Sequence, residues 1–281
     1  MPNASAAAEA LSFWRQVLPK ELGRDLASVA SVRTGHHNVA KLTTHNAGSW
    51  FAKYTSPEYA SQEQAVNRCL RAKPATAELV PVLVHVNAQA GLVLSAELNG
   101  HHPSKRQLLA HLDTLVDALV AIHTTPMPAN GINYDLPEID VPVGAYQAKL
   151  QARVRDAESR KTDGSVFMGL VHGDLNPDNV LLEQDQWRFL DWEFSMLNDV
   201  RWDLVSIATE FNFSRVEMAE LIAGYHASAR LATTLATFEQ GVDDWLAIYL
   251  GICLGWCEAN NQPKDKYWRY FSSYFAIEPP A

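Results

Sequence analysis

Two stretches of the sequence decide the fold: HGDLNPDNVLL at residues 172–182 and LDWEF at residues 190–194. Short apolar runs bracket each polar loop, a pattern typical of short strands that end in loops. The loops carry Asp174, Asn179 and Asp191, so three oxygen-bearing side chains come at strand ends, where we expect them to face one cleft. Hard cations such as Mg²⁺ prefer oxygen ligands of this kind. The pattern therefore predicts a site for a hard metal ion.

These residue types suit phosphoryl transfer, which needs a base to orient the acceptor hydroxyl, oxygen ligands for Mg²⁺ and a cation on the phosphates. The two loops supply the base and the ligands. The alternative is that Asp174, Asp178 and Asn179 are only turn formers, since Asx side chains cap and turn readily. Turn chemistry alone does not explain why Asp191 and Asp203 also stand at matching positions later in the sequence.

Together, HGDLNPDNVLL and LDWEF resemble the catalytic and metal loops of the aminoglycoside phosphotransferase and choline kinase superfamily, whose members are relatives of protein kinases. The resemblance implies an α+β, bilobal protein-kinase-like fold with a small antiparallel-sheet lobe and a larger, mainly helical lobe. It also implies a phosphotransferase that uses ATP and Mg²⁺. Asp174 would orient or deprotonate the hydroxyl, and Asn179 and Asp191 would hold Mg²⁺. His172 would brace the loop from behind, and Asp203 matches a position that ties the loop to the following helix.

Toward the N-terminus, β-prone runs predict a small, mostly antiparallel sheet with one helix beside it. The loop at 45–48 has the Asn and Gly content of a hairpin, and Pro57 is placed where a helix best tolerates proline. We take residues 1–98 as the first lobe. The expected strands are 39–44, 50–54, 80–86 and 92–98, and the expected helix runs from 57 to about 73.

Residues 99–281 form the second lobe in this prediction. Leucine, valine and isoleucine recur at helical spacing from Leu108 to Ile122, and most of the following sequence is helical apart from the two loops. The segment 124–144 is rich in proline and lacks periodicity, so we expect an irregular connector or a flap there.

A candidate phosphate-binding cation lies in FAKY at residues 51–54. Lys53 matches the strand lysine that neutralises the α and β phosphates in the resembled fold, and Glu63 matches its ion-pair partner on the helix. Glu58 competes for the second role, but Glu63 is preferred because Leu70 follows it at the family's usual offset. The plain alternatives are a solvated strand lysine and a solvated helix face.

The other nucleotide-binding positions rest on softer motifs. Residues 34–38 occupy the place of the phosphate-covering loop, with Gly35 and Asn38 as its candidates, but they hold one glycine in place of the G-x-G-x-x-G of protein kinases. An ordinary turn explains this segment nearly as well. Ala96 and Leu98 fall where the resembled fold holds adenine through the backbone of its hinge, and they serve as approximate markers.

Glu193 departs from the DFG of protein kinases and agrees with the Asp-x-Glu of choline, thiamine and related kinases. One interpretation is that Glu193 supports Asp191 or a second metal ion. The other is that it is a polar residue that fixes the conformation of the loop. The stretches 191–199, 201–204 and 255–258 look closer to bacterial choline or thiamine kinases than to antibiotic-modifying members. The first hypothesis is therefore a kinase for choline, thiamine or a similar amino-alcohol. An aminoglycoside or other antibiotic phosphotransferase is the runner-up.

Aromatic side chains in the acceptor half are candidates for binding a cationic substrate with a hydroxyl group. An aromatic face holds a cation with about 0.5–2 kcal/mol per contact. The alternative for each of them is a place in the core, since most aromatic residues at helical spacing are buried. The candidates are Trp192, Phe194, Trp202 and Trp256.

Composition narrows the partners and the compartment. The formal net charge of the 281 residues is −9 and no stripe of Lys and Arg is present, so we expect no nucleic-acid partner. The longest apolar run, 245–256, is shorter than the ~20 residues that cross a bilayer, so we expect no membrane insertion. The N-terminal segment lacks a signal-peptide pattern and the three cysteines form no disulfide framework, which indicates the cytoplasm. The sequence does not indicate an oligomeric state.

Two other classes of protein remain as alternatives. A nucleotide-binding pseudokinase that serves as a scaffold usually lacks the base, the lysine or the metal ligands, and all have candidates here. A metal-dependent phosphatase built on His172, Asp174 and Asp191 would need more His and Asp ligands around two metals. Product formation that depends on ATP separates a kinase from both.

Overall fold

The computed structural model describes residues 4–34, 37–46, 48–127 and 167–275, with the isolated positions 152, 155, 156 and 159. The chain forms two compact units, one of residues 1–101 with 181–194 and one of residues 102–180 with 195–281. The predicted division between residues 98 and 99 lies close to the end of the first continuous segment. The return of residues 181–194 to the first unit was not part of that prediction.

The first unit is built on a five-stranded antiparallel sheet with the strand order β1-β2-β3-β5-β4. The predicted small antiparallel sheet is present, although β4 and β5 are shorter than expected. The sequence patterns missed β1, because LASVASVRT contains many small residues and few bulky β-formers. The strands are β1 (Leu26–Thr34), β2 (His37–Thr44), β3 (Ser49–Tyr54), β4 (Leu83–Asn87) and β5 (Leu92–Ala96).

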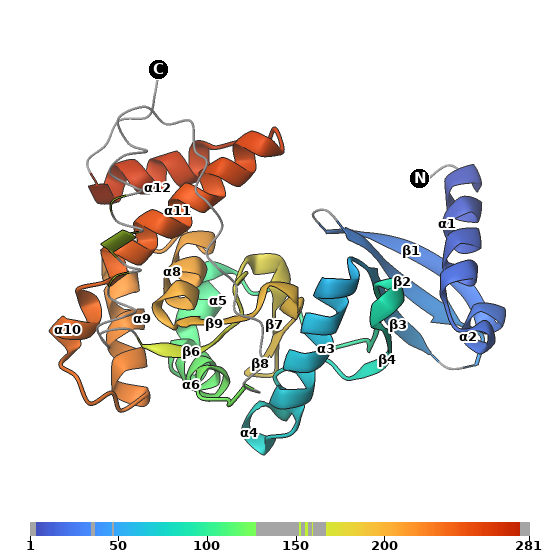
Figure 1. Cartoon of the computed structure of the whole chain (residues 1–281), viewed down its shortest axis with the longest axis horizontal. Helices are drawn as coiled ribbons and strands as arrows, with labels where there is room; N and C mark the ends of the chain where they lie inside the picture. Colours follow the sequence, from blue (N-terminus) through green and yellow to red (C-terminus); the bar gives the residue numbers. More distant parts are fainter. Residues whose placement is uncertain are drawn as a thin grey trace. The chain divides into compact units, whose positions relative to one another are not determined.

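The sheet and two N-terminal helices share an apolar core. Helices α1 (Ala4–Val17) and α2 (Lys20–Asp25) lie beside β1 (Figure 1). Each large side chain buried here stabilises the unit by about 1.5–3 kcal/mol. The cluster contains Trp14, Leu18, Leu26, Ala40, Leu42, Ala52, Leu92 and Leu94.

Lys53 lies at the centre of the sheet, where its backbone is held on both sides. It pairs with Val39 of β2 and with Val93 of β5. The residue is only 8% exposed. The sequence alternative of a solvated strand lysine is therefore wrong.

Helix α3 (Pro57–Arg71) starts as expected and carries Glu63 on its buried side. The hydroxyl of Ser56 accepts a hydrogen bond from the Tyr59 N–H at 3.2 Å, and Pro57 occupies the first turn. This cap fixes where the helix begins and therefore where Glu63 stands along it. Two short helices follow in this unit, α4 (Pro74–Ala77) and the 3₁₀ helix η1 (Ala88–Ala90).

The hairpin of β7 (Val180–Glu183) and β8 (Gln186–Phe189) leads to the second polar loop. Its turn residues Gln184 and Asp185 have φ of 46° and 67°, and two positive φ angles are typical of the type I′ turn that suits two-residue hairpins. The turn predicted at 183–186 is confirmed. The Phe189 N–H donates to Leu79 O at 2.7 Å, which ties β8 to the first unit.

The second unit is mainly helical, as predicted. A two-stranded antiparallel sheet of β6 (Met168–Val171) and β9 (Met196–Asp199) lies among the helices. The short 3₁₀ helices η2 (Pro177–Asn179) and η3 (Trp192–Phe194) end the two polar loops, the second of them in the first unit. The helices are α5 (Lys105–Ala110), α6 (Leu112–His123), α8 (Arg201–Glu210), α9 (Arg215–Ser228), α10 (Leu235–Glu239), α11 (Val242–Ala259) and α12 (Asp265–Phe275).

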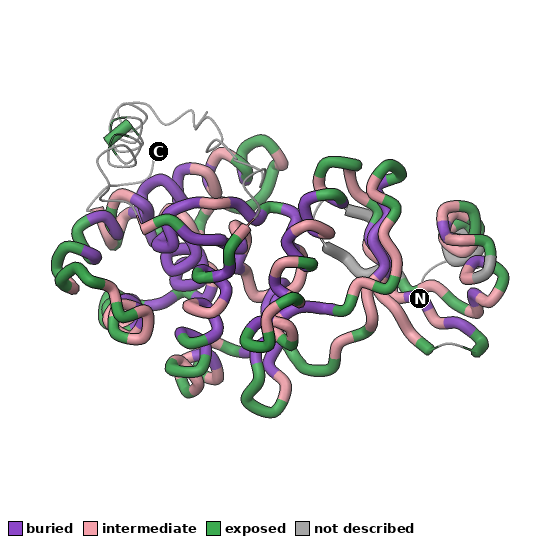
Figure 2. Tube along the Cα trace, turned by 60° about the horizontal axis from the view of Figure 1, so that its bottom comes forward, coloured by how far each residue is buried: buried purple, intermediate pink, exposed green. Residues whose placement is uncertain are grey.

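Helix α8 is the centre of the second unit. Its residues are buried from Arg201 through Thr209, and buried residues are drawn purple in Figure 2. A helix that is buried all round must satisfy its polar side chains internally. Asp203, in its first turn, does so by accepting hydrogen bonds from the backbone N–H groups of His172 and Gly173.

The apolar run at 245–256 forms the middle of α11, as expected for a buried helix, but Trp256 is 46% exposed. Among the described residues, no helix is both long and apolar enough to cross a bilayer. The predicted connector at 124–144 lies outside the described residues from position 128 onward.

Candidate active site

In the first unit, the ammonium of Lys53 gathers three carboxylates. Glu63 of α3 lies 3.2 Å from Lys53 Nζ and Glu193 of η3 lies 2.5 Å from it, and Asp191 contacts the same nitrogen. The competing Glu58 is exposed at the start of α3. The structure thus brings together Lys53, Glu63, Asp191 and Glu193, all of which were candidates from the sequence.

The charges of this cluster keep Lys53 protonated. Burial by itself would lower the pKa of Lys53, but the attraction of Glu63, Asp191 and Glu193 outweighs it and holds the pKa well above its ordinary value. For Glu63, burial raises the pKa while Lys53 pulls it down. A permanently charged ammonium is what the phosphates of a nucleotide require.

Asp191 is presented by an unusual turn of the backbone. Its φ is 64°, in the left-handed region, which Asp tolerates better than most residues do. The chain is anchored directly after it, because the indole N–H of Trp192 donates to Phe189 O at 2.9 Å. The Thr55 hydroxyl donates to Glu193 at 3.2 Å. Asp191 and Glu193 are therefore fixed by the bonds of Trp192 and Thr55 as well as by Lys53.

In the second unit, amide groups of its own loop hold Asp174. Nδ2 of Asn176 and Nδ2 of Asn179 donate to Asp174 Oδ2 at 3.0 and 2.9 Å. Asn179 Nδ2 also donates to the main-chain oxygen of Asp174 at 2.9 Å. Because both bonds use its amide nitrogen, Asn179 turns its carbonyl oxygen away from Asp174. A side-chain carbonyl oxygen is one of the ligand types that suit Mg²⁺.

The start of this loop is fixed from below by buried groups. The His172 N–H and the Gly173 N–H donate to the Asp203 carboxylate at 2.7 and 3.0 Å. The Asp174 N–H donates to His172 Nδ1 at 3.3 Å. His172 and Asp203 are both fully buried. Their positions agree with supporting roles behind and beneath the loop.

The four aromatic candidates have different surroundings. Trp192 is fully buried and its N–H is engaged by Phe189 O, so it is a core residue and its predicted contact with substrate is wrong. Trp202 is buried against Trp245 and Tyr249, and its indole N–H donates to Gly173 O at 3.0 Å. It supports the backbone of the loop at residues 172–179. Phe194 and Trp256 remain exposed enough to meet a ligand, at 36% and 46%.

The structure adds little support for the nucleotide-binding candidates that rest on weak motifs. Gly35 lies outside the described residues, and Asn38 is described only as a strand residue of β2 paired with Tyr54. Ala96 ends β5, where its N–H donates to Val82 O at 2.8 Å, and Leu98 follows in an irregular segment. These positions stay predictions.

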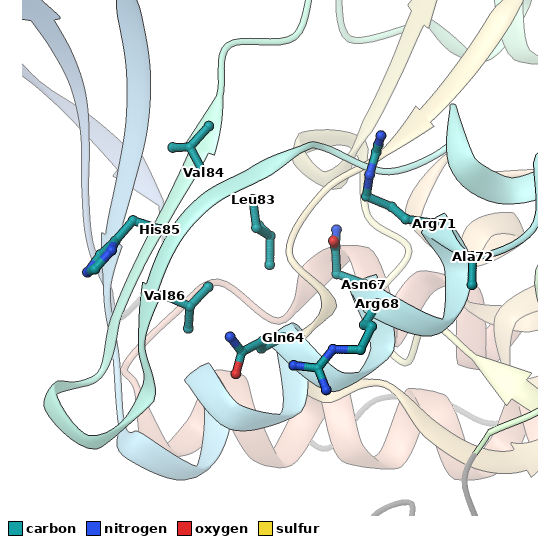
Figure 3. Close-up of a pocket in the computed structure, with 9 residues that line it drawn as sticks. All are labelled: Gln64, Asn67, Arg68, Arg71, Ala72, Leu83, Val84, His85 and Val86. Atoms are coloured by element: carbon teal, nitrogen blue, oxygen red, sulfur yellow. The ribbon is translucent and has the colours of Figure 1, made fainter.

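A separate groove of about 630 Å³ lies between α3 and β4 in the first unit (Figure 3). In the figure, Asn67 and Arg68 project from the helix, and Leu83 and Val86 lie between the strand and the helix. Arg71 at its edge donates to Ala77 O at 2.9 Å and so holds the end of α4. None of the predicted site residues lines this groove.

Comparison with known proteins identifies the family. The model of the phosphotransferase enzyme family matches residues 28–238, which is most of the chain. The chain belongs to the phosphotransferase enzyme family. This confirms the superfamily that the two loops resemble.

A curated protein is similar to part of the chain. Protein LicA of Haemophilus influenzae is 41% identical over 60 residues, which are 21% of this chain and 22% of the relative. The chain thus matches about a fifth of the length of this curated relative.

Solved structures are similar over nearly the whole length. The choline kinase LicA from Streptococcus pneumoniae has a TM-score of 0.69 at 17% identity, with 96% of this chain and 99% of that chain covered. The GDP complex of aminoglycoside 2′-phosphotransferase-IIIa has a TM-score of 0.69 at 13% identity, with 96% and 98% covered. At such low identity these likenesses show the fold alone, and they confirm the predicted kinase-like α+β fold.

Sequence reasoning missed several residues that support the site. His123 of α6 lies 3.2 Å from Asp203, and Tyr225 of α9 lies 2.7 Å from His123. Thr55 and Asn176 hold Glu193 and Asp174. Of these residues, only Asn176 could have been predicted from the local sequence, because it lies inside the loop motif.

Proposed function

We propose that this chain is a kinase that transfers a phosphoryl group from ATP to a hydroxyl of a small molecule. The observation that carries the proposal is the buried ammonium of Lys53 held by Glu63 and Asp191 together. A permanently charged ammonium serves the phosphates, and a carboxylate beside it serves the metal that accompanies them.

In the proposed reaction, Asp174 orients the acceptor hydroxyl and accepts its proton. The hydroxyl oxygen bonds to the γ-phosphorus of ATP as the bond from that phosphorus to the bridging oxygen breaks, which yields a phosphate monoester and ADP. Lys53 holds the phosphates. We propose that Asn179 and Asp191 hold Mg²⁺, which when bound neutralises charge on the phosphates.

For the acceptor, we propose choline, thiamine or a similar cationic amino-alcohol. The Asp191-Trp192-Glu193 sequence and the similarity to a structure named choline kinase support this class. An aminoglycoside is the second candidate, since the aminoglycoside 2′-phosphotransferase-IIIa structure is equally similar by TM-score. Exposed Phe194 and Trp256 are proposed as contacts for the acceptor.

The acceptor can be identified by ADP release with ATP and Mg²⁺ against choline, ethanolamine, thiamine, sugars and aminoglycosides, with the product identified by mass spectrometry. A phosphorylated amino-alcohol is the expected product. A phosphorylated aminoglycoside would favour the second candidate. ADP release that no acceptor stimulates would contradict the proposed activity and would favour a nucleotide-binding scaffold.

The proposed base is tested by Asp174→Asn, which keeps the shape of the side chain but removes its basicity. We expect turnover to fall by about 10²- to 10⁴-fold, the usual scale for a positioned base, with ATP binding nearly unchanged. Asp178→Asn is the matched control, because Asp178 is an exposed carboxylate of the same loop. Equal turnover in the two folded variants would remove Asp174 from the mechanism.

The phosphatase alternative has less support. Among the described residues, no group of three or more His, Cys, Asp or Glu side chains is arranged to hold a metal ion. A two-metal hydrolase would need such a group. Release of phosphate from a phosphate monoester in the absence of nucleotide would support the phosphatase alternative.

A further inference from the structure

Strand β4 lies at one edge of the five-stranded sheet. It pairs with β5, and among the described residues no strand pairs with its other side. The N–H and C=O groups on the free side of an edge strand can take an extended peptide as a further strand. Proteins often protect such an edge with lysine or proline, but β4 has the sequence LVHVN and contains neither. Val82, just before the strand, and Val84 within it are 43% and 47% exposed.

The groove between α3 and β4 follows this edge. His85 and Val86 pair with Leu94 and Val93 in regular register, so their side chains point to opposite faces of the sheet. Both of them nevertheless line the groove of about 630 Å³ (Figure 3). A peptide that lies along the groove therefore has the free edge of β4 within reach.

The helix side of the groove carries positive charge that the chain does not neutralise. Arg68 and Arg71 both lie in the last turn of α3 and line the groove. Arg68 is exposed, and its side chain has no hydrogen-bond or ion-pair partner in the part of the chain that the structure describes. Its neighbours on the helix, at positions 64, 65, 71 and 72, include no acidic residue. The groove is therefore complementary to a carboxylate.

The spacing of the two arginines suits an extended partner. Cβ atoms three positions apart on a helix are separated by about 5–6 Å, and alternate residues of a strand by about 6.6–6.8 Å on the same face. Long side chains take up this small difference. Two acidic residues with one residue between them can therefore face Arg68 and Arg71 together, and apolar residues between the acidic ones can cover the exposed valines.

A second copy of the chain fits this edge less well. Two copies that pair through β4 in antiparallel fashion are related by a two-fold axis perpendicular to the sheet, so both α3 helices lie on the same face. The arginines of one copy then face those of the other. Like charges brought together across an interface disfavour it.

We propose that the edge of β4 and the groove beside α3 bind an acidic, extended segment of another protein, which adds to the sheet as a sixth strand. Its carboxylates pair with Arg68 and Arg71. The proposal goes beyond the proposed kinase activity and does not depend on it, because none of the predicted site residues lines this groove.

The first test uses a fluorescein-labelled peptide of the sequence Glu-Val-Glu-Val-Glu-Val and measures its binding to the full chain by fluorescence anisotropy. We expect the same peptide with glutamine in place of glutamate to bind at least about tenfold more weakly, because hydrogen bonds to charged groups are lost. N-methylation of two successive residues removes one N–H on each edge of the peptide and keeps every side chain. We expect a loss of about tenfold or more there too.

Arg68→Glu tests the charge of the groove. We expect it to weaken binding of the glutamate peptide by at least about tenfold, because attraction becomes repulsion. Arg24→Glu is the matched control, since Arg24 is likewise exposed in the last turn of a helix of the first unit but lies outside the groove. Its affinity should stay within about twofold of the parent. Arg71 is left unchanged because it holds the end of α4.

If Arg68→Glu lowers the melting temperature, Arg68→Gln replaces it, because it removes the charge without reversing it. Equal affinities in the Arg68 and Arg24 variants would overturn the proposal. Equal binding of the glutamate and glutamine peptides, or of the parent and N-methylated peptides, would do so as well.

Hydrogen exchange followed by mass spectrometry locates the bound peptide. Exchange in residues 83–87 should slow when the peptide binds, while exchange in residues 20–25 should not change. Unchanged exchange in residues 83–87 would contradict strand addition. Analytical ultracentrifugation tests the second copy: a dimer that Val84→Lys converts to a monomer would show that another copy covers this edge, and the proposal would be wrong.

Discussion

Lys53 is a buried ammonium whose three carboxylates come from α3 and from the segment that follows β8. Buried ion pairs are weak evidence for stability, because the loss of hydration offsets much of the attraction between the charges. Removing one partner is different, since the remaining charges are then buried without compensation. The cluster around Lys53 should therefore be sensitive to a single substitution in both activity and stability.

Lys53→Met keeps the length of the side chain and removes its charge. We expect kcat/KM for ATP to fall by about 10²- to 10³-fold, because a preorganised charge on the phosphates is lost. We also expect the free energy of unfolding to fall by about 3–5 kcal/mol, because the buried carboxylates lose their counter-charge. Steady-state kinetics with varied ATP and denaturant unfolding measure the two effects.

Lys41→Met is the control for this prediction. Lys41 lies on the neighbouring strand β2 and forms a surface ion pair with Glu97, with 39% of its side chain exposed. A surface pair contributes about 0–1 kcal/mol, so both measurements should stay close to the parent. If the two lysine variants behave alike, the burial of Lys53 has no functional meaning.

The sequence predicted residues that lie within local motifs and missed those that act across the fold. Lys53 and Glu63 are separated by 10 residues and follow the pattern of one strand and one helix. His123 and Asp203 are separated by 80 residues, and nothing near His123 in the sequence marks its partner. Trp192 was misplaced for a related reason, because an aromatic residue beside a metal loop can face either the ligand or the core.

At the level of elements, Arg201 joins β9 to α8 and α10. Its guanidinium donates to both oxygens of Asp199, at 2.9 and 2.6 Å, and to Phe238 O at 3.1 Å. A planar guanidinium matches a carboxylate in this way, and burial makes the pairing hard to replace. Gly241, before α11, leaves the room that this guanidinium occupies, because a Cβ there would lie 2.2 Å from Arg201 Nη1.

Gly241→Ala should therefore destabilise the second unit. Its methyl group must displace a buried guanidinium that has three hydrogen bonds, and we expect a loss of about 1–3 kcal/mol from overpacking. Thermal unfolding followed by circular dichroism measures the change.

Gly224→Ala provides the opposite expectation in the same unit. Gly224 lies inside α9, where a Cβ would meet Val116 at an ordinary 3.6 Å. Alanine in a helix interior is favoured over glycine, so we expect a gain of about 0.5–1 kcal/mol. Equal shifts of the melting temperature in the two variants would show that Arg201 moves aside without loss.

Elements whose ends are marked by turn or capping residues were predictable from the sequence. The hairpins at 45–48 and 183–186 have turn residues between apolar runs, and α3 has a cap and an initial proline. β1 and β9 were not expected. The first has few β-formers, and the second, Met196–Asp199, is polar at half of its four positions and pairs with a strand far away in the sequence. Such strands form because partners exist, and a single sequence does not display the partner.

At the scale of the whole molecule, the first unit is discontinuous in sequence. Residues 1–101 and 181–194 form one compact body, which the Leu182 bridge to His101 and the Phe189 bond to Leu79 connect. The second segment brings Asp191 and Glu193, two of the three carboxylates on Lys53. A unit cut at residue 101 would lack them.

A fragment of residues 1–101 should accordingly fold poorly. We expect a broad thermal transition and no protection by ATP, because Lys53 is left with Glu63 and the hairpin packing is lost. Joining residues 181–194 to the fragment through a flexible linker should sharpen the transition and raise its midpoint. An equally sharp transition in both fragments would show that the hairpin is dispensable for this unit.

The return of residues 181–194 also has a consequence for synthesis on the ribosome. The chain emerges from its N-terminus, and the five-stranded sheet is complete once residue 96 has left the exit tunnel. The carboxylates at 191 and 193 arrive only after residues 102–180 have been translated. During that interval the nascent sheet holds a lysine that has Glu63 beside it but lacks two of its three ionic partners, so the first unit is completed late although most of it is made first.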